Sequence, residues 1–408
     1  MVPDGWKLST IEEISNVSSG GTPSRKNDAY WNGNIPWVTT AEVQFKVIED
    51  TSEKITEEGL ANSSAKLFPV DTILMAMYGQ GKTRGQVAKL GIEASTNQAC
   101  AAIVLHPGYE VDYYYQFLVS QYENIREMAN SGGQENLSGG IVKSIQVPVP
   151  PLPEQKKIAQ ILSTWDKAIT TTEQLLTNSQ QQKKALMQQL LTGKKRLMDK
   201  NGDRFSGEWK ATAVAAFIKE SRVPGSTGDI AKKITVKLYG NGVVAKDEKR
   251  SGSESTKYYR RSAGQFIYSK LDFLNGAFGI IPEELDGYES TLDLPAFDFL
   301  GNVNVEWFTY YVSREEFYSS NLGLANGGRK ARRVNPNDLL RIKIPTPSLE
   351  EQQKIAAVLS CADQEITALQ HKLEALKQEK KALMQQLLTG KRRVQLNEHN
   401  SKVITYGN

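Results

Sequence analysis

The sequence predicts an α+β protein: two globular mixed α/β domains separated by two long helices that form an antiparallel coiled coil, with internal pseudo-two-fold symmetry. Three observations predict this class. The eleven residues KALMQQLLTGK occur at 184–194 and again, unchanged, at 381–391. A long apolar repeat precedes each copy, and mixed strand and helix patterns fill the rest. We expect domains at 1–150 and 198–347, helices at 151–197 and 348–394, and a tail at 395–408.

The repeated eleven residues belong to a longer internal duplication. At a constant offset of 197 residues, 145–197 aligns with 342–394 without a gap, and more than half of the positions are identical. The globular stretches, about 7–144 and 209–341, have diverged almost beyond recognition. A recent duplication would have left them equally similar. Internal repeats reveal architecture. The similar segments are therefore expected to perform the same function twice, and the dissimilar domains to perform related functions on different targets.

Each similar segment reads as a short strand followed by a long helix. The prolines of IQVPVPPLP and IKIPTPSLE favour extended backbone. Glu154 and Glu351 then fall in a first helical turn, where the helix dipole favours negative charge. Gly193 and Gly390 stand where a helix end commonly needs a left-handed residue. A helix of 39 residues measures about 58 Å at 1.5 Å per residue.

The apolar residues of these helices recur at 4,3 spacing over about five heptads, which favours coiled-coil pairing. The alternative is two independent surface helices. Helices this long overrun a domain of about 140 residues, whose radius of gyration is about 14 Å. If both ends of the second domain lie on one side, the second helix starts where the first stops. The pair is then antiparallel.

The globular stretches both read as strands followed by a helix. The first predicts strands within 66–79 and 98–107 and a helix over 109–131. The second predicts a strand over 264–270, further strands to about residue 300, and a helix over 305–321. Three aromatic residues of the turn-rich stretch 20–43 are interpreted as core or loop anchors rather than base-stacking groups; they are Tyr30, Trp31 and Trp37.

Composition limits the class of protein. Hydrophobic and charged fractions of 39% and 24% are typical of soluble globular proteins. No apolar run approaches the roughly 20 residues that span a bilayer, and the N-terminus lacks a signal-peptide pattern. Cys100 and Cys361 are too few for a disulfide framework or a thiolate metal site. We expect a cytoplasmic protein without a structural metal and without a membrane partner.

Catalytic motifs are missing from the sequence. Gly81-Lys82-Thr83 resembles part of a nucleotide-binding P-loop, but Ala76 stands where that motif needs glycine, and the following residues are a poor helix. There is no Asp/Asn-Pro-Pro-aromatic motif for adenine methylation, no GxGxxG loop and no metal-ligand cluster. The chain is expected to bind a target rather than to catalyse a reaction, and to hold no cofactor of its own.

The net charge of +4 is mild, but basic residues cluster along the chain. Clusters of one sign indicate a polyanionic partner, whereas evenly mixed charge is ordinary solvated surface. Basic and amide side chains in loops contact phosphates and base edges, although each one also fits a solvated surface residue. The candidate DNA-contacting residues are Gln80, Lys82, Arg84, Lys257, Tyr258, Arg260, Arg261, Lys270, Arg329, Lys330, Arg332 and Arg333.

The identical helix tips indicate docking surfaces. Coiled-coil pairing tolerates many residues at exposed positions, so pairing alone does not require the tips to match. Two equivalent sites for two copies of another protein explain the identity better. The candidate partner-binding residues are Leu186, Met187, Gln188, Gln189, Leu190, Leu383, Met384, Gln385, Gln386 and Leu387.

These features resemble the DNA-specificity subunit of Type I restriction–modification enzymes. The resemblance covers nearly the whole chain: GW near the start, GGTPS…YWNGNIPW, and twice a PxPxxxEQxxIA…L segment with a KALMQQLLTGK tip. It implies two target-recognition domains, each reading one half of an asymmetric, bipartite site in double-stranded DNA. The helices would set the spacer and dock two modification (methyltransferase) subunits.

The resemblance also implies what the chain does not do. It would be the non-catalytic specificity subunit of a multi-subunit adenine-N6 DNA methyltransferase and restriction endonuclease. S-adenosylmethionine, ATP and Mg²⁺ are expected on the modification and restriction subunits. Two alternatives remain: a coiled-coil scaffold with two protein-interaction domains that binds no DNA, and a stand-alone enzyme such as a nuclease. The first leaves the basic clusters unassigned, and the second lacks a catalytic set.

Overall fold

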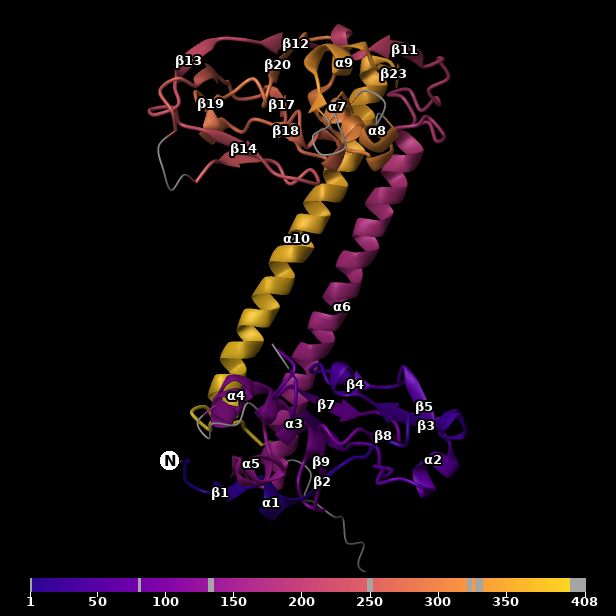
Figure 1. The fold of residues 1–408 in the computed structure, drawn as a ribbon, viewed down its shortest axis with the longest axis vertical. Helices are drawn as coiled ribbons and strands as arrows, with labels where there is room; N and C mark the ends of the chain where they lie inside the picture. The colour runs from indigo at the N-terminus through magenta and orange to yellow at the C-terminus, as the bar shows by residue number, and fades with distance from the viewer. Residues whose placement is uncertain are drawn as a thin grey trace, which may run out of the picture. The chain divides into compact units, whose positions relative to one another are not determined.

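The chain folds into two compact units. The computed structural model describes residues 2–79, 82–130, 136–247, 252–320, 325–326 and 333–396. Unit 1 comprises residues 1–173 and 371–408, and unit 2 comprises residues 174–370. Two helices of 39 residues, α6 (Leu152–Leu190) and α10 (Leu349–Leu387), cross the division (Figure 1). Each unit therefore holds the start of one long helix and the end of the other.

Unit 1 is a mixed α/β domain built on a five-stranded sheet of order β2-β9-β6-β7-β4, with a three-stranded sheet β5-β3-β8 and a two-stranded sheet β1-β10. Its strands are β1 (Lys7–Thr10), β2 (Ser15–Ser19), β3 (Trp31–Val38), β4 (Val47–Ile48), β5 (Glu53–Ile55), β6 (Ile73–Ala76), β7 (Val87–Leu90), β8 (Ser95–Thr96), β9 (Cys100–Leu105) and β10 (Gln146–Val149). Its short helices are α1 (Ile11–Ile14), α2 (Glu57–Ala61), α3 (Val111–Ser120), α4 (Tyr122–Asn130) and α5 (Gly139–Ser144).

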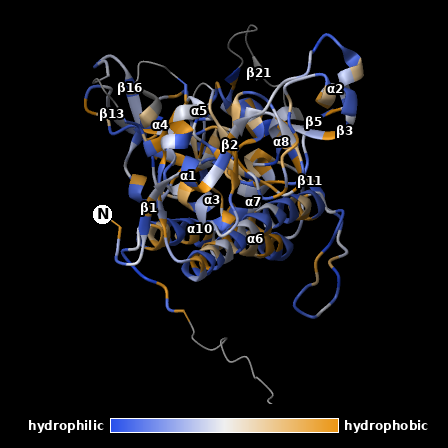
Figure 2. Ribbon diagram, turned by 90° about the horizontal axis from the view of Figure 1, so that it is seen from below, coloured by the Kyte–Doolittle hydropathy of each residue, from blue (hydrophilic) through white to orange (hydrophobic). Residues whose placement is uncertain are grey.

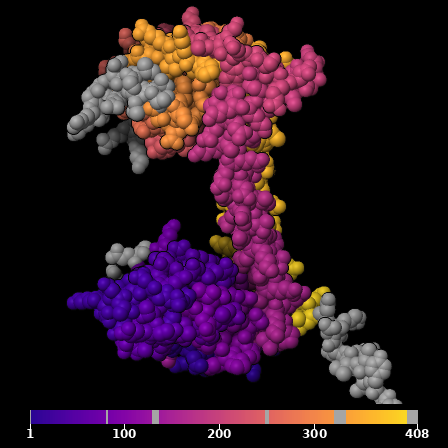
Figure 3. Space-filling model, turned by 90° about the vertical axis from the view of Figure 1, so that its right-hand side faces the viewer, coloured from indigo at the N-terminus to yellow at the C-terminus, as the bar shows by residue number. Residues whose placement is uncertain are grey.

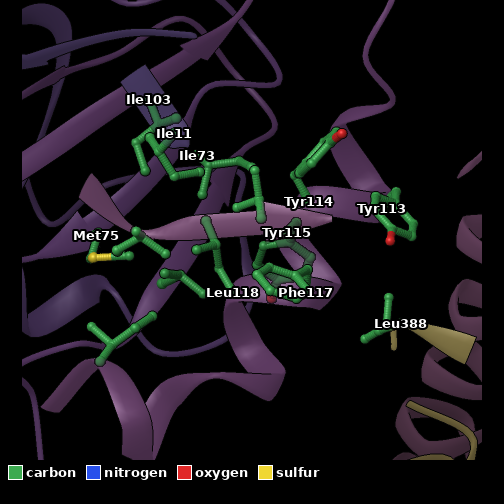
Figure 4. Packing of buried hydrophobic residues seen from close by; sticks show 14 of the residues in the cluster. Ile11, Ile73, Met75, Ile103, Tyr113, Tyr114, Tyr115, Phe117, Leu118 and Leu388 are labelled. Atoms are coloured by element: carbon green, nitrogen blue, oxygen red, sulfur yellow. The ribbon is translucent and has the colours of Figure 1, made fainter. Parts of the chain in front are cut away.

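The five-stranded sheet of unit 1 is buried on both faces. Ile73 and Met75 of β6 pack into one hydrophobic cluster with the aromatic residues of α3, as Figure 4 shows. Leu74 and Ala76 of the same strand belong to a second cluster on the opposite face. This division follows from strand geometry, because successive side chains point to opposite faces. The double burial explains why ILMA is a continuous apolar run rather than an alternating one.

Unit 2 contains a second mixed α/β domain, with sheets of order β12-β20-β17-β18, β13-β16-β19, β11-β23, β14-β15 and β21-β22. Its strands are β11 (Lys210–Ala213), β12 (Ile218–Ser221), β13 (Pro224–Thr227), β14 (Ile234–Val236), β15 (Val243–Ala245), β16 (Lys257–Arg260), β17 (Phe266–Tyr268), β18 (Phe278–Ile280), β19 (Glu289–Ser290), β20 (Ala296–Phe299), β21 (Ala325–Asn326), β22 (Arg333–Val334) and β23 (Lys343–Thr346). Its short helices are α7 (Val305–Val312), α8 (Glu315–Ser320) and α9 (Pro336–Arg341).

The core of unit 2 is predominantly aromatic. Phe266 lies at its centre, with the ring of Phe308 edge-on at 5.5 Å and the ring of Phe297 at 6.3 Å between centroids. Trp307 of α7 is fully buried in the same cluster. Edge-to-face and tilted arrangements are the ones that aromatic quadrupoles favour. Most of the aromatic residues that the sequence concentrates in 264–318 therefore form one packed core.

The long helices pair antiparallel within each unit. In unit 1, Lys380 Nζ lies 2.5 Å from Asp166 Oδ1, and Lys377 Nζ lies 2.7 Å from Glu173 Oε1. As residue numbers decrease along α10, the numbers of their partners increase along α6, so the two helices run in opposite directions. Polar residues recur along both helices in Figure 2. The predicted fold class, with two mixed domains and long antiparallel helices, is confirmed.

Helix lengths differ from the sequence prediction in two respects. The expected helices over 109–131 and 305–321 are each broken in two, as α3 and α4 and as α7 and α8. The long helices end at Leu190 and Leu387, short of the predicted segment ends. Gly193 (φ 71°) and Gly390 (φ 69°) adopt the predicted left-handed conformation and turn the chain back. Within the described residues, no helix is both long and apolar enough to cross a membrane.

Candidate nucleic-acid and partner interfaces

A buried carboxylate anchors the first turn of α6. Glu154 is 2% exposed, and both of its oxygens accept hydrogen bonds from Arg393, which follows α10. Arg393 Nε and Nη2 each lie 2.7 Å from a carboxylate oxygen, and Trp6 Nε1 donates to Oε2 at 3.0 Å. A two-pronged arginine–carboxylate bond is stronger and more specific than a single one. The trio therefore ties the start of the chain, the start of α6 and the end of α10 together.

Unit 2 repeats this trio at the start of α10. Glu351 is 1% exposed and accepts hydrogen bonds from Arg196 Nε at 2.6 Å and Nη2 at 2.8 Å, and from Trp209 Nε1 at 3.1 Å. From the sequence, the two glutamates are expected only to interact with the helix dipole, and this role in the trio is not predicted. The available signal was that the glutamate and the arginine are both retained at the 197-residue offset.

A second repeated contact joins the globular domains to the paired helices. Asp166 Oδ2 accepts from Gln116 Nε2 of α3 at 2.5 Å, while its other oxygen meets Lys380. In unit 2, Asp363 Oδ2 accepts from the hydroxyl of Tyr310 of α7 at 2.7 Å, while its other oxygen meets Lys183. Each aspartate thus links both long helices to its own domain.

The identical helix tips divide into buried and exposed residues. Leu190 (1% exposed) and Leu387 (3% exposed) belong to the cores of units 2 and 1, and Met384 is also buried. This placement differs from the prediction for those three residues, because the chain's own core already covers the side chains. Leu186, Met187 and Leu383 are half-buried against the same cores. The exposed candidates are Gln188, Gln189, Gln385 and Gln386.

The first basic loop connects β6 to β7, which pair antiparallel. Lys82 is exposed, and its carbonyl oxygen accepts a hydrogen bond from the hydroxyl of Tyr122. Arg84 is half-buried in the same turn. Gln80 lies outside the described residues. Because β7 rather than a helix follows the loop, the arrangement lacks the helix N-terminus of a P-loop, in agreement with the sequence interpretation.

In unit 2, strand β16 carries three of the candidate residues. Lys257 and Arg260 are exposed, and Tyr258 is half-buried. Arg261, directly after the strand, was wrongly placed among the DNA-contacting candidates. It is 1% exposed and donates to Ser290 Oγ at 2.7 Å, Ser221 O at 2.8 Å and Leu294 O at 3.2 Å.

Buried Arg261 has a structural role. Its guanidinium satisfies acceptors at Ser221 and in the turn from Ser290 to Leu294, and desolvation lowers its pKa to about 10. Its side chain therefore cannot reach a ligand at the surface. Arg261 could not be distinguished from Arg260 by sequence alone, because adjacent arginines in a basic stretch look alike until their packing is known.

Two other candidates of unit 2 lie together. The backbone N–H of Val334 donates to the carbonyl of Lys270 at 2.9 Å, which places Arg333 next to Lys270. Arg333 is exposed, and its Nε lies 3.7 Å from Asp293 Oδ1. Three further candidates lie outside the described residues; they are Arg329, Lys330 and Arg332.

The tryptophans of the stretch 20–43 are anchors, as predicted. Trp37 is buried and donates its Nε1 to Gly21 O at 2.9 Å. Trp31 packs edge-on against it at 5.1 Å, and Arg25 lies 3.8 Å above the Trp31 ring. Within the described parts of the chain, no group of three or more His, Cys, Asp or Glu residues is arranged to hold a metal ion.

Comparison with known proteins identifies the family. The model of the Type I restriction modification DNA specificity domain matches residues 3–178 and 299–378. The chain belongs to this family. The first match spans the domain of unit 1 with the start of α6, and the second runs from the end of β20 through most of α10.

Curated members of the family include specificity subunits of Type I restriction enzymes. The chain is 32% identical to the MjaIX subunit of Methanocaldococcus jannaschii over 173 residues, and 30% identical to the EcoR124I/EcoR124II subunit of Escherichia coli over 167 residues. These alignments cover 41% and 40% of this chain, but only 39% and 40% of the relatives. The MjaVIII subunit of M. jannaschii is 23% identical over 432 residues, which cover 96% of this chain and 94% of the relative.

Solved structures of the family share the fold. The S subunit of a Type I restriction–modification system from M. genitalium has a TM-score of 0.58 at 14% identity, with 97% of both chains covered. The HsdS subunit from Thermoanaerobacter tengcongensis has a TM-score of 0.51 at 16% identity, with 96% of this chain and 98% of that chain covered. At such low identity the likeness shows the fold alone.

Proposed function

We propose that this chain is the DNA-specificity subunit of a Type I restriction–modification enzyme, with each globular domain reading one half of an asymmetric, bipartite site in double-stranded DNA. One observation carries the proposal. The Trp–Glu–Arg trios are the same in both units, and an aspartate at the equivalent position of each links both long helices to the domain. These contacts nevertheless support globular domains that share almost no sequence. The paired helices with their trios and aspartate links form a frame that is equivalent in both units. Two different recognition domains on such a frame are expected to read two different halves of a split site.

The frame also supports two identical partners. The four tip glutamines are exposed at equivalent positions of α6 and α10, so two modification subunits would meet the same surface twice. The chain would supply no catalysis. Its partners would bring S-adenosylmethionine for adenine-N6 methylation, and restriction subunits would bring ATP- and Mg²⁺-dependent cleavage. The assembly would act in the cytoplasm.

The test is co-expression of the chain with a modification subunit from the same genome. The purified complex is expected to methylate adenines only within a bipartite sequence, and neither protein alone is expected to do so. Methylation by this chain alone would overturn its non-catalytic role. Stable assembly without sequence-selective DNA binding would favour the scaffold alternative.

A further inference from the structure

Unit 1 contains a cavity of about 790 Å³ where its globular domain meets the paired helices. The walls come from the segment at β4, from β7, from α3, and from the α6 and α10 segments of the same unit. Figure 1 shows β4, β7 and α3 beside the start of α6, and Figure 3 shows the globular domain packed along that helix. The cavity lies within one unit and uses none of the candidate DNA residues.

The cavity is basic. Six lysines and three carboxylates line it. Lys89, Lys377 and Lys380 are engaged in ion pairs. The other three lysines are exposed, and no carboxylate of the described residues lies within 4 Å of them; they are Lys46, Lys167 and Lys381. A concave surface with unpaired positive charge attracts a polyanion.

The unpaired charge on the long helices differs between the units. At the 197-residue offset, Lys167 corresponds to Gln364, whereas Lys381 corresponds to Lys184. Two identical protein partners would require the same surface in both units, as the helix tips provide. A surface whose charge differs between the units therefore does not suit two identical protein partners.

The cavity adjoins the first candidate recognition loop. Phe45 lines the cavity with a positive φ of 52°, an uncommon backbone conformation for a bulky residue that often marks a functional site. Its ring packs edge-on against Tyr122 at 5.1 Å. The hydroxyl of Tyr122 in turn donates to the carbonyl of Lys82. The cavity wall and the loop that carries Lys82 are therefore linked through Tyr122.

We infer that the cavity of unit 1 holds the sugar–phosphate backbone of DNA beside the half-site read by the first domain. This inference rests on the proposed function. Lys46 and Lys167 bind phosphates and read no bases. Phosphate contacts set the position of a protein on the duplex without carrying sequence information, so these lysines would strengthen binding to every DNA sequence equally.

The test uses the complete complex with modification subunits. Its DNA affinity is measured by fluorescence anisotropy from low to high salt, with a cognate and a scrambled duplex. The variant carries Lys46→Gln and Lys167→Gln, the latter being the residue found in unit 2. Each lost phosphate contact lowers the slope of log K against log salt by about 0.9. We expect a slope lower by about 1.8, weaker binding to both duplexes, and an unchanged ratio between them.

A matched control carries Lys156→Gln and Lys157→Gln. These lysines are exposed on the same helix but lie outside the cavity, so the salt slope is expected to stay at the wild-type value. An unchanged slope in the cavity variant would overturn the inference while leaving the proposed function intact. Loss of the modification subunits with an unchanged slope would instead assign the cavity to a protein partner. Failure of the wild-type complex to discriminate the duplexes would overturn the proposed function itself.

Discussion

At the scale of single residues, buried charged side chains stabilise the contacts between distant segments of each unit. Glu154 and Glu351 lie in nearly water-free surroundings and depend on an arginine for their charge to be tolerated. Arg261 is the reverse case, a buried cation satisfied by a hydroxyl and two carbonyls. In each case the partner groups come from distant segments, so one side chain ties several elements together.

Removal of one partner should destabilise the unit that contains it. We expect Arg393→Ala to lower the free energy of unfolding of unit 1 by about 2 kcal/mol, because it leaves a buried carboxylate with only the Trp6 bond. Arg196→Ala should have a similar effect on unit 2. Urea denaturation followed by tryptophan fluorescence measures both, and Lys391→Ala, an exposed neighbour of Arg393, should change little.

Neighbouring arginines of unit 2 should separate stability from DNA binding. Arg261→Ala should lower the free energy of unfolding by about 2–3 kcal/mol, since three acceptors lose a charged donor. Arg260→Ala should leave stability within about 0.5 kcal/mol and reduce the salt slope of DNA binding by about 0.9. Denaturation and anisotropy on the same preparations would show the contrast. Equal effects of the two variants on stability would contradict the structural role of Arg261.

Acid should weaken the Arg25–Glu53 pair that lies beside Trp31. The hydrogen bond from Arg25 lowers the pKa of Glu53 below its usual 4.5. A lowered folded-state pKa adds stability above the unfolded value, and that stability is lost as the pH falls through the folded-state pKa. The pair is largely exposed, so its contribution is small. The stability difference between the wild type and Glu53→Gln should shrink below pH 4.5, and a difference that grows there would contradict the pairing.

At the scale of elements, the aspartate links fix how the long helices pair and how each domain sits on them. Asp166 meets Lys380 from the opposite helix and Gln116 from α3. Asp363 meets Lys183 and Tyr310 in the same way. The register of the helix pair and the seating of the domain therefore depend on the same side chain in each unit.

An exchange of charges should test this register. Asp166→Lys alone and Lys380→Asp alone should each destabilise unit 1, because like charges then face each other. The double exchange should recover about 1 kcal/mol relative to the sum of the single changes, as expected for a partly buried pair. A double-mutant cycle by urea denaturation measures the recovery. Strict additivity would show that the two side chains do not interact in solution.

Elements with local causes could be predicted from the sequence. The heptad pattern located α6 and α10, and the glycines after them located their ends, because both signals lie within a few residues. The meeting of Glu154 with Arg393 joins residues 239 positions apart, and no local pattern predicts it. Gln116 and Tyr310 occupy diverged domains, so even the internal repeat gave no hint of them. The basic clusters located candidate ligands but could not separate exposed Arg260 from buried Arg261.

At the scale of the whole molecule, the chain combines duplicated segments with diverged domains. The helices, their tips and the ionic trios are duplicated, whereas the two domains have diverged. Identical features suit identical protein partners, and divergent features suit different DNA half-sites. The basic cavity belongs with the divergent features, because Lys167 in its lining is replaced by Gln364 in unit 2.

Two-part DNA recognition is tested by the sequence that the chain and its modification subunit methylate in vivo, read by genome-wide detection of N6-methyladenine. The wild type should mark one asymmetric motif of two different halves separated by an unspecified spacer. A chimaera with the first domain, residues 7–144, in place of 209–341 should mark an inverted repeat of the first half, because two identical domains on antiparallel helices read the same bases in opposite directions. A continuous motif for the wild type, or an unchanged motif for the chimaera, would contradict the account.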